Sequence, residues 1–163
     1  MMEADVAYRE LVTRLRGRRV TAVRVFLFTL QIYLAPEDTD ARDLEMWCEP
    51  SWHVCDGAGI VTGSGAIEGP STFDDDAEVA RASATIVRVS DAAKVLVGQT
   101  LETLDVDPVS HALVGHFSGG LVVATFLDDP DISSAWVLRD PHRDIAVRGT
   151  AHGIVMGSRE HAA

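Results

Sequence analysis

Cys48 and Cys55 lie on either side of His53 and are the first candidates for a metal site. A structural zinc site normally contains a pair of cysteines about two to four residues apart, together with two further ligands. These cysteines are farther apart, and no second cluster supplies the remaining ligands. We therefore expect no metal and no cofactor, and reduced thiols that pack as small hydrophobic side chains.

Three histidines are candidates for acid–base catalysis. His111 and His116 are five positions apart, so on one strand they point to opposite faces. His142 stands between Asp140 and Asp144, and a histidine–aspartate pair can transfer protons. That segment, Asp-Pro-His-Arg-Asp, has the composition of a solvated turn. We assign no catalytic residue, and an enzyme that uses His142 or His116 stays an alternative.

A run of carboxylates lies just before the middle of the chain: Asp74, Asp75, Asp76 and Glu78. Carboxylate oxygens suit calcium or magnesium, but consecutive aspartates lack the spacing of a calcium-binding loop. We expect a solvated acidic loop, and these four residues are our candidates for contact with a basic protein.

The preceding residues, 57–70, are rich in glycine, and Gly57, Gly59 and Gly63 have the outline of a dinucleotide-binding turn. That motif needs a helix directly after it, whose N-terminus meets the pyrophosphate. Residues 64–70 form helices poorly, so we expect a loop or bulge.

Length and composition indicate one globular domain over residues 1–163, since 47% of the residues are hydrophobic and 24% are charged. The longest apolar stretch, 23–35, is too short to cross a bilayer, which takes about 20 residues. The first residues do not resemble a signal peptide. We expect a cytoplasmic protein.

The net charge is −11, and residues 1–25 hold six arginines and three acids. That segment therefore carries +3, which leaves −14 on residues 26–163. Such a surface repels nucleic acid and anionic membrane. It favours a basic protein partner through electrostatic steering, or serves solubility alone.

The spacing of apolar residues predicts the helices and strands that position these candidate residues. Apolar residues at helical spacing predict a helix over 5–16, ended by Gly17. Alternation predicts strands at 20–25, 26–34, 44–48 and 52–54, with a polar turn at 36–40. A second helix is expected over 90–97 after a strand at 84–89. A glycine hairpin joins 112–117 to 121–127, short strands follow at 136–138, 145–147 and 153–156, and a polar tail begins at 158.

Residues 15–25 align with 96–106 at an offset of 81, and Trp52 aligns with Trp136 at an offset of 84. This predicts two repeat units, about 5–56 and 90–157, joined by a Gly/Asp-rich connection over 57–89. Both tryptophans should be core residues. The expected fold is mainly β (α+β), a two-repeat antiparallel sandwich or partly open barrel with two short helices.

The Leu-x-Gly-x-x-Val/Leu entries at 15–20 and 96–101, the hairpin after a glycine turn and the later tryptophan carry a resemblance. They resemble a group of uncharacterised bacterial two-repeat β-domain proteins, and some immunity-type proteins look alike. The resemblance covers roughly residues 11–157 without the central loop. The chain departs from the pattern in its glycine-rich insert and in an apolar first hairpin turn around Phe26 and Leu27. The shared positions are structural and imply no catalytic residues.

The sequence thus favours a non-enzymatic interaction domain that binds a basic protein through acidic loops, and the resemblance implies an immunity-like role. A small-ligand-binding β domain with a pocket between the two repeats is the alternative. A homo-oligomer held by a symmetric apolar patch also stays open.

Overall fold

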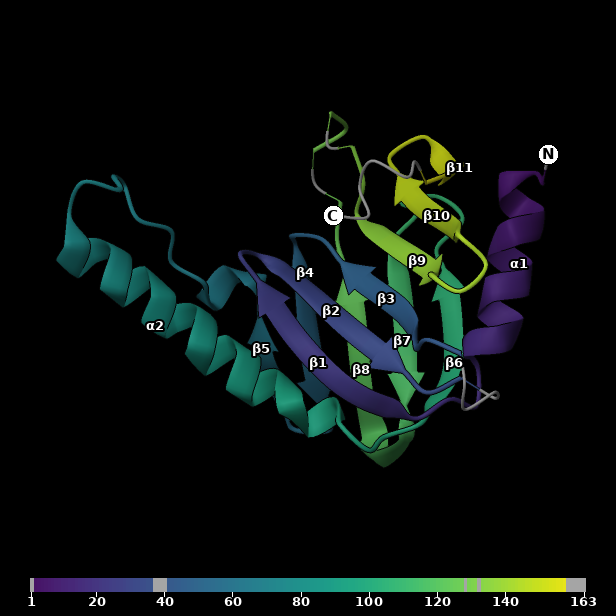
Figure 1. The fold of residues 1–163 in the computed structure, drawn as a ribbon, viewed down its shortest axis with the longest axis horizontal. Helices are drawn as coiled ribbons and strands as arrows, with labels where there is room; N and C mark the ends of the chain where they lie inside the picture. Colours follow the sequence, from purple (N-terminus) through teal and green to yellow (C-terminus); the bar gives the residue numbers. More distant parts are fainter. Residues whose placement is uncertain (1, 37–40, 128, 132, 158–163) are drawn as a thin grey trace.

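Two antiparallel sheets packed face to face form the body of the computed structural model, which describes residues 2–36, 41–127, 129–131 and 133–157 (Figure 1). The six-stranded sheet has the order β1-β2-β3-β9-β10-β11, and the five-stranded sheet has the order β5-β4-β8-β7-β6. This confirms the predicted mainly β, α+β class and favours the sandwich over the barrel. The polar turn expected within 36–40 and the tail from 158 lie largely outside the described residues.

The strands of the six-stranded sheet are β1 Val20–Phe26, β2 Thr29–Leu34, β3 Leu44–Cys48, β9 Trp136–Asp140, β10 Ile145–Thr150 and β11 Gly153–Met156. The strands of the five-stranded sheet are β4 Trp52–Asp56, β5 Gly59–Gly63, β6 Leu101–Val106, β7 Leu113–Phe117 and β8 Leu121–Thr125. Inward-facing positions alternate with outward-facing ones, as in β3 and β9, where every second residue is buried.

The core between the sheets contains both tryptophans predicted there. Trp52 is 2% exposed and Trp136 is fully buried. Each indole N–H donates to a backbone carbonyl, Trp52 to Phe28 at 2.7 Å and Trp136 to His111 at 2.9 Å. A buried indole needs such an acceptor, so these bonds fix the depth and orientation of both rings.

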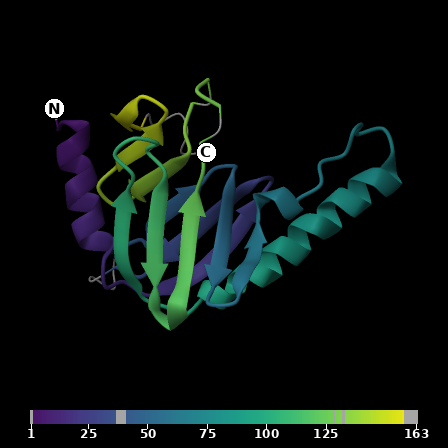
Figure 2. The ribbon, with the colours of Figure 1, turned by 180° about the vertical axis from the view of Figure 1, so that it is seen from behind.

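Two helices cover the sides of the sandwich, seen from both directions in Figures 1 and 2. Helix α1, Ala4–Leu15, buries Ala7, Leu11 and Leu15 and packs on β9, β10 and β11. Gly17 follows with a φ of 82°, the left-handed conformation that ends helices. Helix α2, Asp76–Ala93, packs on β1 and β5, which are the edge strands of the two sheets on this side.

Helix α2 corrects the sequence analysis. The predicted strand at 84–89 lies inside α2, and the predicted helix at 90–97 is the end of α2 followed by a 3₁₀ turn, Lys94–Leu96. The connection expected over 57–89 holds β5 and most of α2. The physical reason is a buried stripe at helical spacing, Ala82, Thr85, Val89 and Ala93, which outweighs the strand preference of the β-branched residues between them.

The two halves of the chain have similar element orders: α1 is followed by the five strands β1 to β5, and α2 by the six strands β6 to β11. In the first half, β1 to β3 belong to the six-stranded sheet and β4 and β5 to the five-stranded sheet. In the second half, β6 to β8 belong to the five-stranded sheet and β9 to β11 to the six-stranded sheet. Matching hydrogen bonds join them: the Gly17 N–H donates to Leu101 O at 2.8 Å, and the Gly98 N–H donates to Val20 O at 2.9 Å. A repeat would produce this arrangement, and the repeat stays a prediction.

Within the described ranges, neither helix has the length and apolar character that crossing a bilayer requires.

Candidate functional site

The four acidic residues singled out in the sequence lie together at the N-terminal end of α2. Figures 1 and 2 show this end of the helix, with the loop that precedes it, extending beyond the edges of the sheets. Residues 71–77 are all exposed, and Ala82 is the first buried residue of the helix. The structure therefore presents the acidic residues on a projecting helix end, which we call the acidic tip (residues 71–78).

Two of the four carboxylates hold the acidic tip in shape. The Asp75 side chain accepts hydrogen bonds from the backbone N–H groups of Ala77 at 3.0 Å and Glu78 at 3.2 Å, as an N-cap does. The Glu78 carboxylate accepts from the backbone N–H of Ser71, and this bond lowers the pKa of Glu78. The Asp75 bonds cap the first turn of α2, and the Ser71–Glu78 bond fastens the preceding loop to that turn.

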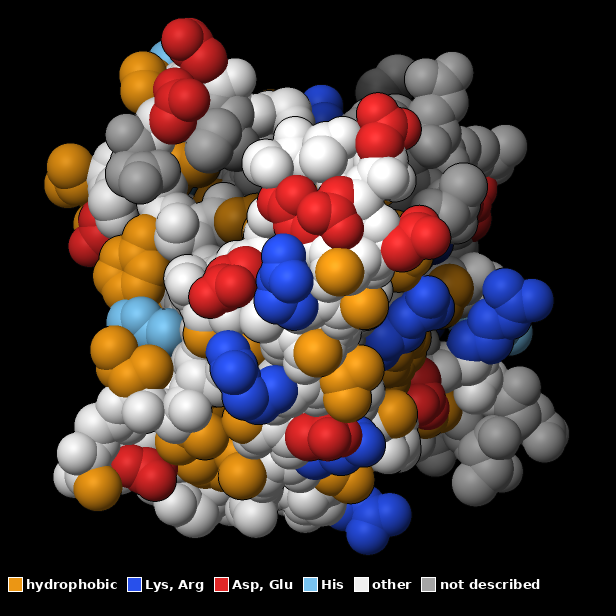
Figure 3. Space-filling view, turned by 90° about the vertical axis from the view of Figure 1, so that its left-hand side faces the viewer, with side chains coloured by type: hydrophobic (Ala, Val, Ile, Leu, Met, Phe, Trp, Pro, Cys, Tyr) orange, Lys and Arg blue, Asp and Glu red, His pale blue; other side chains and the backbone are white. Residues whose placement is uncertain are grey.

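The other two carboxylates, those of Asp74 and Asp76, form no hydrogen bond or ion pair with the described residues. Phe73, beside them, is 83% exposed. Figure 3 views the molecule from this side, and most of the acidic side chains visible there lie in the upper half of the face. The acidic tip thus offers two unpaired charges and one exposed aromatic ring.

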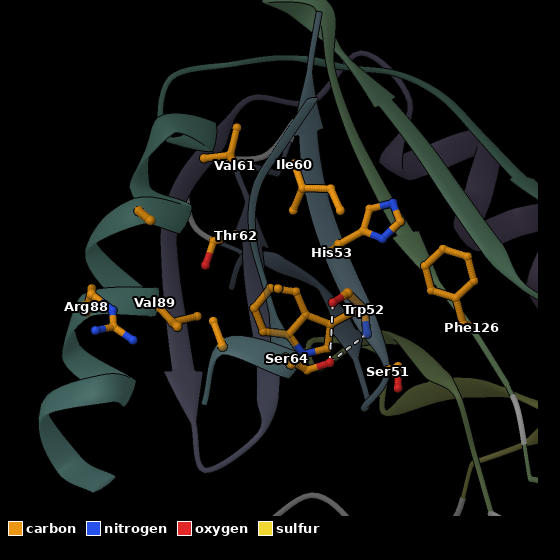
Figure 4. Close-up of a pocket in the computed structure, with 14 residues that line it drawn as sticks. Ser51, Trp52, His53, Ile60, Val61, Thr62, Ser64, Arg88, Val89 and Phe126 are labelled. Carbon is orange, nitrogen blue, oxygen red and sulfur yellow. Dashed lines mark hydrogen bonds between the residues drawn. The ribbon is translucent and has the colours of Figure 1, made fainter. Parts of the chain in front are cut away.

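A pocket of about 590 Å³ lies at the base of α2, against β4 and β5. Figure 4 shows Arg88 and Val89 of α2 on one side of it, His53 and Phe126 on the other, and Trp52 between them. The His53 and Phe126 rings pack at 4.7 Å between centroids. Ser64 closes one end, where its hydroxyl accepts a hydrogen bond from the backbone N–H of Trp52 at 3.0 Å.

The charge of this pocket is unlike that of the whole chain. Its lining is mostly apolar and includes Arg88 and His53 but no aspartate or glutamate. The lining takes Trp52 from the first predicted repeat unit and Ala92 and Phe126 from the second. An apolar pocket with a cation and no acid is suited to an amphipathic molecule that carries a negative charge.

The structure does not bring the candidate catalytic histidines to a carboxylate. His142 and His116 are exposed, and no hydrogen bond links either imidazole to an acid among the described residues. Asp140 instead accepts from the backbone N–H of His142 at 3.1 Å and pairs with Arg14 of α1. The carboxylate therefore holds a turn and a helix in place.

Cys48, His53 and Cys55 do not converge. Cys48 is fully buried between the sheets, and burial raises the pKa of its thiol. His53 and Cys55 lie at the outward-facing positions of β4. The part of the chain that the structure describes contains no group of three or more metal-ligating side chains.

The glycine segment at 57–63 is a β-hairpin. Gly57 lies in the turn between β4 and β5, and Gly59 to Gly63 are β5 itself. The Asp56 carboxylate accepts from the N–H groups of Ala58 at 2.8 Å and Gly59 at 3.1 Å, which fixes the turn. The loop expected here from the sequence is thus a turn and a strand, and the strand forms one wall of the pocket.

Sequence reasoning placed only the C-terminal end of α2 in a helix, and it therefore missed the long helix and the pocket beside it. Two signals could have found the helix. Asp75 followed by Glu78 has the spacing of a helix N-terminus, and Ala82, Thr85 and Val89 have the spacing of one helical face.

The fold and these surfaces define the chain as an α+β sandwich of two antiparallel sheets with a projecting acidic helix end and an apolar pocket at its base. Comparison with protein-family models, with curated proteins and with solved structures finds no match for it.

Proposed function

We propose that the protein is a non-enzymatic interaction domain that binds a basic protein partner through its acidic tip. The observation that carries this proposal is the exposure of Asp74 and Asp76, unpaired with the described residues, on a helix end that projects from the sandwich. We place the protein in the cytoplasm. An immunity-like role is the form of this function that the sequence resemblance suggests.

The chemistry of the acidic tip suits arginine and lysine side chains. Ionised carboxylates form charge-assisted hydrogen bonds with these groups, which are stronger than neutral ones. The net charge of −11 attracts a basic partner from a distance, and Phe73 adds apolar contact. Because the Asp75 cap and the Ser71–Glu78 bond already order the loop, less conformational entropy is lost on binding.

The test compares two variants that change the net charge equally. Asp74→Lys with Asp76→Lys alters the acidic tip without touching its capping bonds. Glu102→Lys with Asp105→Lys alters exposed acids on β6, the strand farthest from β5 in its sheet. Proteins captured from the host lysate by the wild-type chain are identified, and the affinity of each basic one is then measured with purified components at low and high salt.

We expect the acidic-tip variant to bind at least tenfold more weakly, since each charge-assisted bond contributes about 1.5–3 kcal/mol. The β6 variant should bind much as the wild type does, and salt should weaken binding. Equal affinity of the wild type and the acidic-tip variant for every partner would refute the proposal. A complex of the chain with itself alone would favour the homo-oligomer.

Small-ligand binding is the second candidate, and the pocket at the base of α2 favours it. Its volume of about 590 Å³ lies within the range of small-molecule sites, about 300–1,000 Å³. Ala92→Trp would fill the pocket, whereas Ala84→Trp places the same side chain on an exposed part of α2 outside the lining. A ligand retained in native mass spectrometry by the wild type and by Ala84→Trp, but lost in Ala92→Trp, would support this function. A wild-type spectrum without bound ligand would count against it.

A further inference from the structure

A row of outward-facing side chains crosses three strands of the six-stranded sheet, on the face directed toward the viewer in Figure 1. Trp47 of β3 lies opposite Val137 of β9, and Val137 lies opposite Arg148 of β10. Arg139, the next outward-facing residue of β9, stands beside this row. The register thus places an indole and two guanidinium groups around one valine.

These side chains enclose a small cavity of about 70 Å³. Trp47, Val137, Arg139 and Arg148 line it, with Glu49 and Ser134 completing the polar part of the lining. One water needs about 10–15 Å³ measured in this way, so the cavity has room for several waters or for one small organic anion. It is separate from the acidic tip and from the pocket at the base of α2.

The two guanidinium groups of the cavity differ in their partners. Arg139 donates to the Glu45 carboxylate at 2.9 Å, and its guanidinium lies over the Trp47 ring, 4.9 Å from the centroid. Arg148 pairs with no acid among the described residues, and its Nε is buried without a hydrogen-bond partner. A buried charged donor without an acceptor costs free energy, so the cavity lacks an acceptor beside Arg148.

The carboxylates around the cavity determine which charge a bound anion can carry. Glu45 pairs with Arg139, whereas the Arg148 guanidinium has no ion-pair partner among the described residues and keeps an unused donor at Nε. Glu49 also lines the cavity, and its carboxylate accepts from the Thr29 hydroxyl at 3.1 Å. Glu49 repels a dianion such as phosphate more strongly than a monocarboxylate, whose single charge can pair with Arg148.

We propose that this cavity binds a small aliphatic monocarboxylate. The carboxylate accepts hydrogen bonds from the Arg148 guanidinium, whose planar fork matches its two oxygens. The alkyl group contacts Val137 and the Trp47 ring. The volume of about 70 Å³ fits a free acid of a few carbon atoms and excludes a peptide terminus with its side chain.

The experiment follows the indole N–H signals of ¹⁵N-labelled protein by NMR while sodium acetate or sodium propionate replaces sodium chloride at constant ionic strength. Trp47→Phe assigns the Trp47 signal. We expect that signal to shift with added carboxylate and to saturate. The signals of Trp52 and Trp136 should stay in place, since both rings are buried in the core and hydrogen-bonded to backbone.

Arg148→Gln removes the unpaired charge and should weaken acetate binding about tenfold, the loss expected for one charge-assisted bond. Arg148→Lys keeps the charge without the fork and provides a second variant if Arg148→Gln does not fold. Arg88→Gln, an arginine far from this cavity in the fold, should leave the affinity unchanged.

A wild-type Trp47 signal that does not saturate would overturn the proposal and leave ordered water as the occupant. Equal acetate affinity in a folded Arg148 variant would overturn the role of Arg148. Tighter binding of phosphate or of a peptide C-terminus than of acetate or propionate would overturn the ligand class.

Discussion

Gly149 of β10 lies directly opposite Trp136 of β9, and the indole ring covers its backbone. A Cβ atom at position 149 would stand 2.1 Å from both Cε2 and Nε1 of the ring. The ring cannot move aside cheaply, because it is fully buried and donates to the His111 carbonyl at 2.9 Å. Gly149→Ala therefore forces either the ring or strand β10 to shift.

The cost of that shift has two parts. Overpacking a filled core costs about 1–3 kcal/mol, and loss of a buried hydrogen bond costs about 1 kcal/mol more. We expect Gly149→Ala to lower the free energy of unfolding by about 2–4 kcal/mol. Gly65→Ala is the matched control, because a Cβ there meets nothing within 4 Å. It should change stability by less than about 0.5 kcal/mol.

Urea denaturation, followed by tryptophan fluorescence and by far-UV circular dichroism, measures both variants. Coincident transitions from the two probes would justify a two-state analysis. If Gly149→Ala were as stable as Gly65→Ala, the packing of Trp136 over Gly149 described above would be wrong.

Two further predictions concern ionic contacts. Asp140 is fully buried and pairs with Arg14, and its other cation, Arg143, is more distant, with Nε at 3.9 Å. Arg14→Met therefore removes the closer cation from a buried carboxylate and should cost about 3 kcal/mol in urea denaturation. Lys94→Met, in an exposed pair, should cost less than about 1 kcal/mol. Equal costs would contradict the structural role of Asp140. The Ser71 N–H lowers the pKa of Glu78, so the stabilisation by Glu78 is present above the unfolded pKa of about 4.3 and is lost as pH falls through the lower folded pKa. The difference in melting temperature between the wild type and Glu78→Gln should therefore shrink between about pH 5 and pH 2, and a constant difference would refute this account.

Much of the sheet structure could be predicted because alternation is a local property. The burial of every second residue in β3 and β9 follows directly from the period of the sequence. The turn between β1 and β2 shows where this local signal fails. Leu27 has a positive φ of 53°, a conformation for which turns normally use glycine, asparagine or aspartate, so its residue type does not indicate a turn. The neighbouring Phe28 carbonyl accepts from the Trp52 indole, a contact that alternation cannot reveal.

Helix α2 shows the opposite failure, in which local preference gave the wrong element. Thr85, Ile86 and Val87 favour a strand by intrinsic preference. The buried stripe of α2, which includes Thr85 and Val89, and the packing of the helix on β1 and β5 outweigh that preference. The acidic residues were therefore identified from the sequence as partner candidates, but their place on a projecting helix end was not.

The cavity over Val137 could not be predicted for a different reason. Trp47 and Arg148 line the same cavity because both lie opposite Val137 of β9, which is paired with β3 on one side and with β10 on the other. The strand order and the register that produce this arrangement cannot be predicted from any short segment of the sequence. Side chains on three strands then form a cavity in which Arg148 has a buried donor without an acceptor.

The proposed functions depend on surfaces that can be changed separately. The acidic tip bears unpaired negative charge, whereas the pocket at the base of α2 and the cavity over Val137 each contain a guanidinium group with no ion-pair partner among the described residues. In a chain of net charge −11, the long-range field attracts cations and opposes the approach of small anions. Affinity for a carboxylate must therefore come from short-range contacts with Arg148, which salt screens weakly, whereas binding through the acidic tip should fall steeply with salt. The salt dependence of the two binding reactions thus separates them, and either proposal can fail while the other stands.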